Sequence, residues 1–349
     1  MPEPSARARR PTQSDVAALA GVSRTIVSAV INGPEAQAAL RVSSAARDRV
    51  LAAIEQVGYI PNVAARSLAS GRNDIIGVFT YEPVFPMDNG SYYHDILLGI
   101  EDEADRTGHS LLLSNARKDR GERAIYHAQA NTLRVADGVI VIGGRIARDE
   151  LTRLHAERFP CVIVGRRELP GVEPSWVAPD YVAGTRRAVE ALLALGHTRL
   201  GFVTPAASTE PSRDRLQGFI EATDIAGLSD HVVHLPLGSG DQLLRQVVNH
   251  QLTAVLSAAH ADAEELVLAA RAAGIAVPTE LSVLSLGGTS DAAGSVRVAE
   301  LKIPHRDLGR EAVRTLLALL GGTAAAPVRL QLDCTLDLEP TVGPAPSRR

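Results

Sequence analysis

From Asp74 onward the sequence alternates between short apolar runs and helical stretches, and this alternation constrains the fold more than any other feature. A βα repeat of this kind requires a parallel sheet with helices on both faces. Two successive series without a long linker predict two α/β lobes that face each other across a cleft, where small ligands usually bind. The apolar runs are IIGVF, LLL, GVIVIG and CVIVG in the first series and LGFVT, HVVHL, TAVLS and LSVLSL in the second. Helices are expected between them near 95–106, 120–133, 149–157, 184–195, 212–223 and 261–273.

The last two elements of the chain do not extend the second series. A helix is expected over 307–320 and a strand near 328–332, and both could return to the first lobe. The expected division is an N-lobe of about 74–178 plus 305–332 and a C-lobe of about 179–304 plus 333–345.

The charge of the chain is distributed unevenly between its two ends. Residues 1–72 hold nine Arg and five acidic residues, a net charge of +4, whereas the remaining 277 residues hold 27 basic and 35 acidic residues, a net charge of −8. A basic head on an acidic body indicates that only the head meets a polyanion such as a nucleic acid. The alternative is an ordinary solvated surface that is basic for no functional reason.

The basic region has the start and stop signals of short helices. The first helix is expected over 13–20 and the second from about Ser23 to Asn32, with Gly21 permitting a tight turn between them. A Pro/Ala-rich loop and a third helix that ends at Gly58 follow. Two short helices joined by a glycine-containing turn form a helix-turn-helix.

Several classes of protein are disfavoured by what the sequence lacks. No apolar stretch is long enough to span a bilayer, and the first residues hold no apolar segment of the kind that a signal peptide needs, so we expect a cytoplasmic protein without membrane contact. Cys161 and Cys334 form no CxxC pair, so neither a disulfide framework nor a metal site is expected. The chain has no GxGxxG motif, no P-loop and no GxSxG elbow, which disfavours an enzyme, and no cofactor is expected.

Two runs in the basic region closely resemble the DNA-binding head and hinge of the LacI/GalR-type bacterial transcriptional regulators. They are TQSDVAALAGVSRTIVSAVING and VSSAARDRVLAAIEQVGYIPNVAARSLASGR. Shorter segments extend the resemblance over nearly the whole chain, namely IIGVF, LLGIEDEA, DGVIVIG, ALLALGHTRLGFV, RLQGF and IPHRDLGREA. The resemblance implies a helix-turn-helix head on a periplasmic-binding-protein-like core, which agrees with the α/β pattern described above.

The resemblance also implies a function. A protein of this family is a homodimeric, sequence-specific DNA-binding regulator, expected here to repress a carbohydrate-utilisation operon under the control of an effector, most often a sugar, bound between the lobes. The alternative is the same fold with a nucleoside, another metabolite or, in a degenerate pocket, no effector. A solute-binding module for transport would share the core but would be secreted and would lack the head. The expected segments are a flexible basic N-terminus (1–11), a helix-turn-helix domain (12–61), a hinge helix (62–72) and an effector-binding and dimerisation domain (73–345).

The second helix of the expected head would read the DNA bases. In a helix-turn-helix its amino-terminal side chains face base edges in the major groove, and here these are Arg24, Thr25 and Ser28. Arg24 can donate two parallel hydrogen bonds to a guanine, worth about 1–3 kcal/mol of discrimination; the alternative is a contact to phosphate. Ser23 could cap the helix and contact phosphate at once. Relatives often carry arginine where this chain has Ala29.

The segment 63–69 resembles the hinge helix of the family. In relatives a leucine at the position of Leu68 is wedged into the minor groove at the centre of the operator, where an apolar side chain unstacks a base step and bends the duplex. The alternative is a linker helix with Leu68 packed on its own domain. Two copies would flank one step, which implies a homodimer and a near-palindromic operator. The expected DNA contacts are Thr12, Ser23, Arg24, Thr25, Ser28, Asn32, Asn62, Ala65 and Leu68.

Arg215, in the segment RLQGF, is the main candidate for binding the effector. It matches the arginine that contacts ligand hydroxyls or charge in relatives; the alternative is a surface salt bridge. Asp180, at the junction of the lobes, could accept hydrogen bonds from hydroxyls or cap the helix that follows. Relatives commonly have Asn-Asp at Ala259-His260 and Asp-Asp at Gly287-Gly288, so two customary carboxylates are missing from this chain.

Other side chains could complete the pocket. His260 and Asp262 are candidates to replace the missing polar groups. Tyr81, Phe85 and Trp176 are candidates for an aromatic wall against a sugar ring, and each could instead belong to the core. The expected effector contacts are Tyr81, Phe85, Arg145, Trp176, Asp180, Arg215, His260 and Asp262. No catalytic residue and no metal ligand is expected.

Overall fold

The computed structural model divides the chain into two compact units, Met1–Asn73 and Asp74–Arg349. It describes residues 11–60, 72–82, 90–114, 123–127, 130–144, 146–204, 209–287 and 296–347. Nearly all of the expected basic N-terminus and hinge helix lies outside these residues, as do the expected site residues Asn62, Ala65, Leu68, Phe85 and Arg145.

The head, within the first unit, is a group of helices packed around a small apolar core. They are α1 (Gln13–Ala20), α2 (Arg24–Asn32), α3 (Pro34–Ala39) and α4 (Ser44–Val57). Val16, Val27 and Val50, one from each of α1, α2 and α4, are fully buried at its centre. α3 occupies the Pro/Ala-rich segment that the sequence assigns to a loop. It begins at Pro34, and the first position of a helix tolerates a residue without an N–H.

Local signals set the ends of these helices. The Asp15 carboxylate accepts hydrogen bonds from the backbone N–H and the hydroxyl of Thr12, both at 2.7 Å, which fixes the start of α1. The Ser23 hydroxyl accepts a hydrogen bond from the backbone N–H of Ile26 at 3.4 Å and caps α2. Gly21 has a φ of 63°, in the left-handed region. This turn lets α1 and α2 meet at an angle of 107°, as in a helix-turn-helix.

The described part of the second unit forms two large sheets, each with six strands, and one short two-stranded sheet. Neighbouring strands are parallel in both sheets, except that β12 and β14 are antiparallel. The two-lobed α/β fold expected from the sequence is therefore confirmed. In order across the N-lobe sheet the strands are β13 (Arg329–Leu332), β7 (Ser175–Pro179), β6 (Cys161–Val164), β5 (Gly138–Val141), β1 (Ile75–Phe79) and β2 (Ser110–Ser114). Across the C-lobe sheet they are β14 (Thr335–Asp337), β12 (Ala299–Lys302), β11 (Ser282–Ser285), β10 (Ala254–Ser257), β8 (Leu200–Thr204) and β9 (Val232–Pro236).

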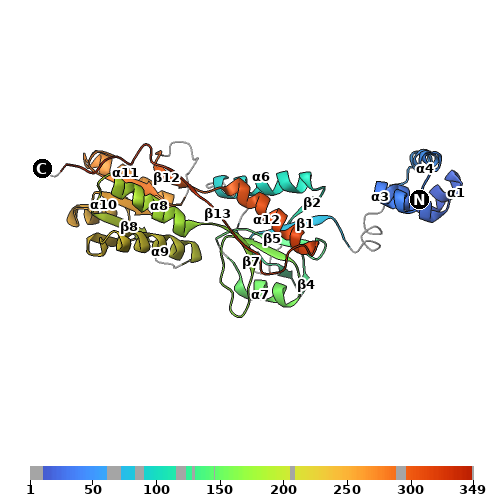
Figure 1. The fold of residues 1–349 in the computed structure, drawn as a ribbon, viewed down its shortest axis with the longest axis horizontal. Helices are drawn as coiled ribbons and strands as arrows, with labels where there is room; N and C mark the ends of the chain where they lie inside the picture. The colour runs from blue at the N-terminus through green and yellow to red at the C-terminus, as the bar shows by residue number, and fades with distance from the viewer. Residues whose placement is uncertain are drawn as a thin grey trace, which may run out of the picture. The chain divides into compact units, whose positions relative to one another are not determined.

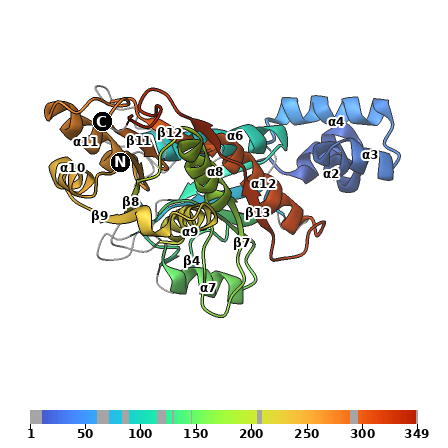
Figure 2. The ribbon, with the colours of Figure 1, turned by 60° about the vertical axis from the view of Figure 1, so that its left-hand side comes forward.

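Helices cover both faces of each sheet (Figures 1 and 2). In the N-lobe, α6 and α12 pack on one face and α7 on the other. In the C-lobe, α8 and α9 cover one face and α10 and α11 the other. Their bounds are α6 (Gly90–Arg106), α7 (Arg148–Ala156), α8 (Tyr181–Ala194), α9 (Glu210–Ile225), α10 (Gly240–Asn249), α11 (His260–Ala272) and α12 (His305–Leu320). A single turn of 3₁₀ helix, Ser229–His231, precedes β9.

The chain passes repeatedly between the lobes. β7 of the N-lobe leads into α8 of the C-lobe, β12 of the C-lobe leads into α12 of the N-lobe, and β13 leads back into β14. Because the chain crosses between the lobes at these three points, the lobes are joined by several connecting segments rather than by one flexible linker.

The helix expected near 120–133 is wrong for the described part of that segment. A short antiparallel pair, β3 (Tyr126–His127) and β4 (Ala130–Asn131), stands there instead. The Thr132 hydroxyl donates to the carbonyl oxygen of Ile125 at 2.9 Å, and the side-chain oxygen of Asn131 accepts from the backbone N–H of Leu133 at 2.8 Å. Such local side-chain bonds compete with helical hydrogen bonds.

No single helix in the described segments is long and apolar enough to cross a membrane, and α1 and α2 meet that test only as a pair bent by 107°. Within the same segments there is no group of three or more His, Cys, Asp or Glu that could hold a metal ion. Cys161 and Cys334 are both free. Burial raises the pKa of the Cys161 thiol to about 12 and that of the Cys334 thiol to about 11, so both are protonated at neutral pH.

Candidate functional site

The amino-terminal end of α2 carries exposed polar side chains. Arg24 and Thr25 are exposed and Ser28, one turn later, is half-buried, whereas Val27 and Val30 point into the core of the head. A shallow hollow of about 540 Å³ lies over this end of α2 and is lined by Gln13, Arg24, Thr25, Ser28, Ala29, Ala36 and Leu40. The structure thus brings the residues expected to face DNA bases together in one concave surface of the head.

This concave surface has the charge that DNA binding requires. The first turn of α2 holds no acidic residue, so the partial positive charge at the helix N-terminus adds to the full charge of Arg24. Gln13 of α1 and Leu40, which follows α3, extend the surface beyond the residues expected from the sequence. They were not predicted because their place depends on how α1 and α3 pack against α2.

The other expected DNA contacts within the described residues cap a helix or lie at the end of α2. Thr12 is half-buried and bonded to Asp15, and Ser23 is exposed while it caps α2. Asn32 is the last residue of α2. Ala29 is only 2 % exposed although it lines the hollow, so its small side chain forms part of the floor.

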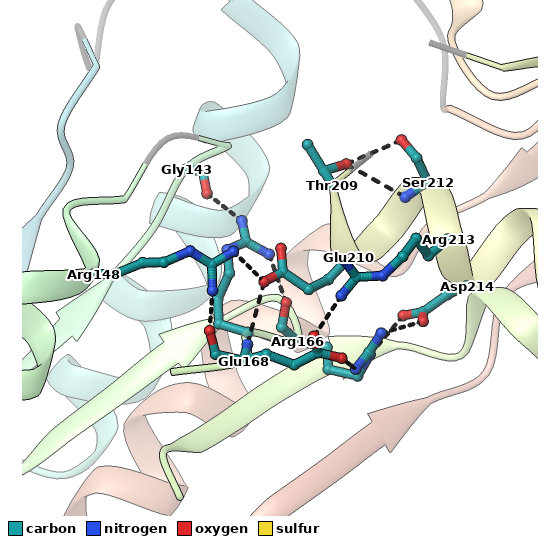
Figure 3. A network of polar contacts seen from close by, with 10 residues as sticks. Gly143, Arg148, Arg166, Glu168, Thr209, Glu210, Ser212, Arg213 and Asp214 are labelled. Atoms are coloured by element: carbon teal, nitrogen blue, oxygen red, sulfur yellow. Dashed lines mark hydrogen bonds and ion pairs between the residues drawn. The ribbon is translucent and has the colours of Figure 1, made fainter. Parts of the chain in front are cut away.

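In the second unit, residues that follow the carboxyl ends of strands contact one another across the lobes (Figure 3). Arg166 follows β6 of the N-lobe and donates two hydrogen bonds to Asp214 of α9 in the C-lobe, at 2.9 and 2.5 Å. We refer to three such ion pairs as the inter-lobe network: Arg166–Asp214 at 2.5 Å, Arg148–Glu210 at 2.6 Å and Arg213–Glu168 at 2.5 Å. The carboxyl ends of both sheets therefore face each other, where open α/β sheets bind their ligands.

The members of the inter-lobe network differ in burial. The side chains of Asp214 and Glu210 are 9 % and 4 % exposed, whereas that of Glu168 is 59 % exposed. The hydrogen bond from Arg166 holds the pKa of Glu168 below its usual range. Burial acts to raise the pKa of Glu210, but its own backbone N–H and Arg148 outweigh that effect and lower it. Glu168 and Glu210 are therefore ionised at neutral pH.

Arg215 is buried at the same end of the C-lobe, with 7 % of its surface exposed. Its Nε donates to the carbonyl oxygen of Leu286 at 2.9 Å and its Nη1 to that of Pro211 at 3.2 Å. Its guanidinium lies 3.6 Å from the centroid of the Tyr181 ring, a cation–π contact. This position is not that of a surface salt bridge, the alternative that the sequence left open.

The remaining polar candidates stand at the starts of helices. Asp180 accepts a hydrogen bond from the backbone N–H of Ala183 at 2.9 Å and so caps α8. His260 is the first residue of α11, and its Nδ1 is buried without a hydrogen-bond partner in the described structure. Burial lowers the pKa of His260, although Glu264 acts to raise it. Burial also raises the pKa of Asp262, in the first turn of the same helix.

The aromatic candidates that the structure describes, Tyr81 and Trp176, pack against other residues of the N-lobe. Trp176 is 8 % exposed and packs in a core cluster that includes Phe79. Tyr81 lies edge-on to Phe79, with ring centroids 4.8 Å apart, and its hydroxyl donates to Glu150 at 3.1 Å. These contacts favour the core interpretation over an aromatic wall.

Sequence reasoning missed the inter-lobe network. One signal was present, because Arg166, Arg167 and Glu168 follow directly after the apolar run CVIVG. Charged residues at the carboxyl end of a parallel strand lie where ligands and facing lobes are contacted. Their partners in α9 could not be chosen, since many other charged residues of the chain have the same local pattern.

Comparison with known proteins gives matches to both units. Residues 12–62 match the bacterial regulatory proteins of the lacI family, and residues 189–338 match the periplasmic binding protein-like domain. The transcriptional regulator CelR of Thermobifida fusca is 30 % identical over 341 residues, which cover 95 % of this chain and 98 % of CelR. The regulator DegA of Bacillus subtilis is 28 % identical over 311 residues, which cover 86 % of this chain and 89 % of DegA.

Solved structures agree with these matches. The complex of the transcriptional regulator CelR with cellobiose has a TM-score of 0.62 and 27 % identity, and the Lac repressor dimer bound to operator and the anti-inducer ONPF has a TM-score of 0.71 and 25 % identity. Each alignment covers 94 % of this chain and 98 % of the other. These relatives are transcriptional regulators and not enzymes. Because the similarity to CelR spans head and core alike, the chain belongs to the LacI family of bacterial regulatory proteins.

Proposed function

We propose that this protein is a cytoplasmic repressor of a carbohydrate-utilisation operon, which binds a near-palindromic operator as a homodimer and responds to a sugar-like effector held between its lobes. The observation that carries the DNA-binding part is the concave surface in which Arg24, Thr25 and Ser28 gather. The buried Arg215 and the inter-lobe network support an effector site at the carboxyl ends of the two sheets. The similarity to a cellobiose complex of CelR supports a sugar-like effector.

Control would operate by linkage between the two units. The inter-lobe network joins the lobes through ion pairs, so a ligand that prefers one arrangement of the lobes shifts the population toward it. A coupling free energy of about 1–3 kcal/mol would change operator affinity by about 5- to 150-fold. The effector acts on the DNA surface because only one lobe arrangement would present two heads in register with the operator.

The DNA-binding proposal is tested by selecting a site from random DNA with the full-length protein and then measuring Arg24→Ala on that site. Loss of a bidentate contact to guanine should weaken binding by about 1–3 kcal/mol at each half-site and relax preference at one base pair. Arg47→Ala changes an exposed arginine of α4 whose side chain makes no hydrogen bond or ion pair within the described residues; it removes the same charge and should weaken binding to all sequences alike. If no sequence is selected from random DNA, the proposal of a sequence-specific regulator is contradicted. If Arg24→Ala and Arg47→Ala weaken binding to all sequences equally, Arg24 contacts phosphate and not a base.

The role of Leu68 is a separate prediction, since this residue lies outside the described part of the chain. Leu68→Ala should weaken binding to the selected site far more than binding to unrelated DNA, because an apolar wedge contributes only where a base step is unstacked, at a cost of a few kcal/mol. Fluorescence anisotropy with both DNAs at one salt concentration measures the two losses. Equal losses on the two DNAs would show that Leu68 is not a wedge.

A further inference from the structure

Among the described residues, five arginines lie at the facing carboxyl ends of the two sheets, and they outnumber their ion-pair partners. Three of them form the inter-lobe network with Glu168, Glu210 and Asp214. The remaining two, Arg167 of the N-lobe and Arg215 of the C-lobe, have no carboxylate within 4.0 Å among the described residues. Both are also the more deeply buried, at 5 % and 7 % exposed.

Within the described segments, the side chain of Arg167 is held by backbone carbonyl groups alone. Its Nη1 donates to the carbonyl oxygen of Arg166 at 2.8 Å and its Nη2 to that of Gly143 at 2.7 Å. Its Nε is buried and has no hydrogen-bond partner in the described structure. Gly165, with a φ of 102°, leaves the space that the guanidinium fills, since a Cβ there would lie 3.0 Å from Nη1. The backbone is thus shaped to keep this cation at the end of β6.

Arg215 is likewise held by carbonyl groups and by the face of Tyr181. Among the described residues, no backbone carbonyl or carboxylate accepts a hydrogen bond from its Nη2. Burial raises the pKa of Tyr181, whereas the charge of Arg215 and a hydrogen bond from its side chain act to lower it. The Arg166–Asp214 ion pair joins the chain neighbours of Arg167 and Arg215, so the two segments that carry these buried cations meet across the lobes.

Two acidic residues of this region that the structure describes are engaged elsewhere. Asp180 caps α8 through the backbone N–H of Ala183. Glu82 accepts hydrogen bonds from the hydroxyl of Tyr93 and the backbone N–H of Gly144. A buried charge without a counter-ion is unfavourable, and two of them repel each other. An anion from outside the chain would remove both penalties at once.

We propose that the effector carries an anionic group, a carboxylate or a phosphate, that binds between Arg167 and Arg215. This inference rests on the proposed effector site and specifies its chemistry. A sugar acid and a sugar phosphate both have this group, and a neutral sugar lacks it. An arginine fork binds either oxyanion through paired hydrogen bonds, and Nη2 of Arg215 is a donor that no backbone carbonyl or carboxylate of the described residues engages.

Inorganic phosphate tests the inference as the simplest anion of this class. At constant ionic strength phosphate should raise the Tm of the full-length protein above its value in chloride, by about 2–4 °C at about five times Kd. Arg215→Gln should weaken phosphate binding at least about tenfold through loss of a charge-assisted hydrogen bond. Arg167→Lys keeps the positive charge but loses the paired N–H donors of the guanidinium, so it should weaken phosphate binding less than Arg215→Gln does. Arg245→Gln, an exposed arginine of α10, is the matched control and should bind phosphate like the wild-type protein.

The outcomes separate this inference from the proposed function. Stabilisation that is unchanged in Arg215→Gln would place the phosphate elsewhere, for example on the head, and would overturn the inference. Equal Tm values in phosphate and in chloride would also overturn the inference. So would a rise in Tm with cellobiose when phosphate produces no rise. In each case, selection of an operator would leave the proposed regulator standing. Gluconate in place of phosphate then assigns the group, because the anion that stabilises more is the better match to the effector.

Discussion

Replacing Gly99 with valine is expected to lower the free energy of unfolding of the N-lobe by about 3 kcal/mol or more. Gly99 lies where α6 crosses α12, two helices that run side by side in Figure 1. A Cβ on Gly99 would stand 1.9 Å from the carbonyl oxygen of Arg306, and a Cβ on Gly309 would stand 2.1 Å from that of Ile96. The helices meet backbone to backbone, so neither carbonyl can give way without breaking its own helix.

Differential scanning calorimetry should record this loss as a fall in Tm of about 6–12 °C for the transition that includes the N-lobe. Helix propensity cannot produce it, since glycine and valine differ by only a few tenths of a kcal/mol, in favour of valine. Gly144→Ala is the matched control, because a Cβ there would meet nothing nearer than Glu82 at 3.7 Å. An unchanged Tm for Gly99→Val would mean that α6 and α12 do not approach this closely.

The features that the sequence predicts well are those with a local cause. The spacing of Thr12 and Asp15 sets the start of α1, and Gly58, with a φ of 63°, ends α4 where the sequence placed its stop. Alternation of apolar runs with helical stretches predicts parallel sheets covered on both faces, because no other arrangement buries such strands. The face of α2 that carries Arg24, Thr25 and Ser28 follows from helical spacing alone.

The close helix crossing and the inter-lobe network were beyond sequence reasoning, because each joins distant parts of the chain. Gly99 and Arg306 come from helices at opposite ends of the second unit, and Arg166 is 48 residues from Asp214. From sequence alone, a glycine within a helix indicates only a position of low helix propensity. A charged residue after a strand indicates only a solvent-exposed loop. Only the packed structure shows that the glycine admits a neighbouring backbone and that the charge has a fixed partner.

Two local predictions failed because competing local forces are nearly balanced. α3 replaces the expected Pro/Ala-rich loop, since a proline that interrupts a helix can equally begin one. β3 and β4 replace a helix because Asn131 and Thr132 bond to the nearby backbone. Both segments are short, so a single cap or side-chain bond decides their conformation.

Replacing Asp214 with alanine is expected to act between the lobes rather than within one. The change leaves the Arg166 guanidinium, whose side chain is 25 % exposed, with the exposed Glu168 as its only ion-pair partner among the described residues. Removing one member of a fully buried pair costs about 3–5 kcal/mol, and partial exposure of Arg166 reduces this to about 2 kcal/mol. We expect a lower Tm and, by small-angle X-ray scattering, a larger radius of gyration, since the lobes lose their most buried two-bond contact.

Two further variants separate charge from packing at this contact. Glu168→Ala removes a carboxylate that is 59 % exposed, so its cost should stay below about 1 kcal/mol; equal Tm losses for the two alanine variants would contradict a special role for Asp214. The double variant Arg166→Met with Asp214→Leu replaces the pair by apolar groups and should be more stable than Asp214→Ala alone. If the double variant recovers Tm, the loss in Asp214→Ala came from the stranded Arg166 charge. The recovered protein should then show lobe closure that weakens less with salt than that of the wild-type protein, because apolar groups replace one of the three ion pairs of the inter-lobe network.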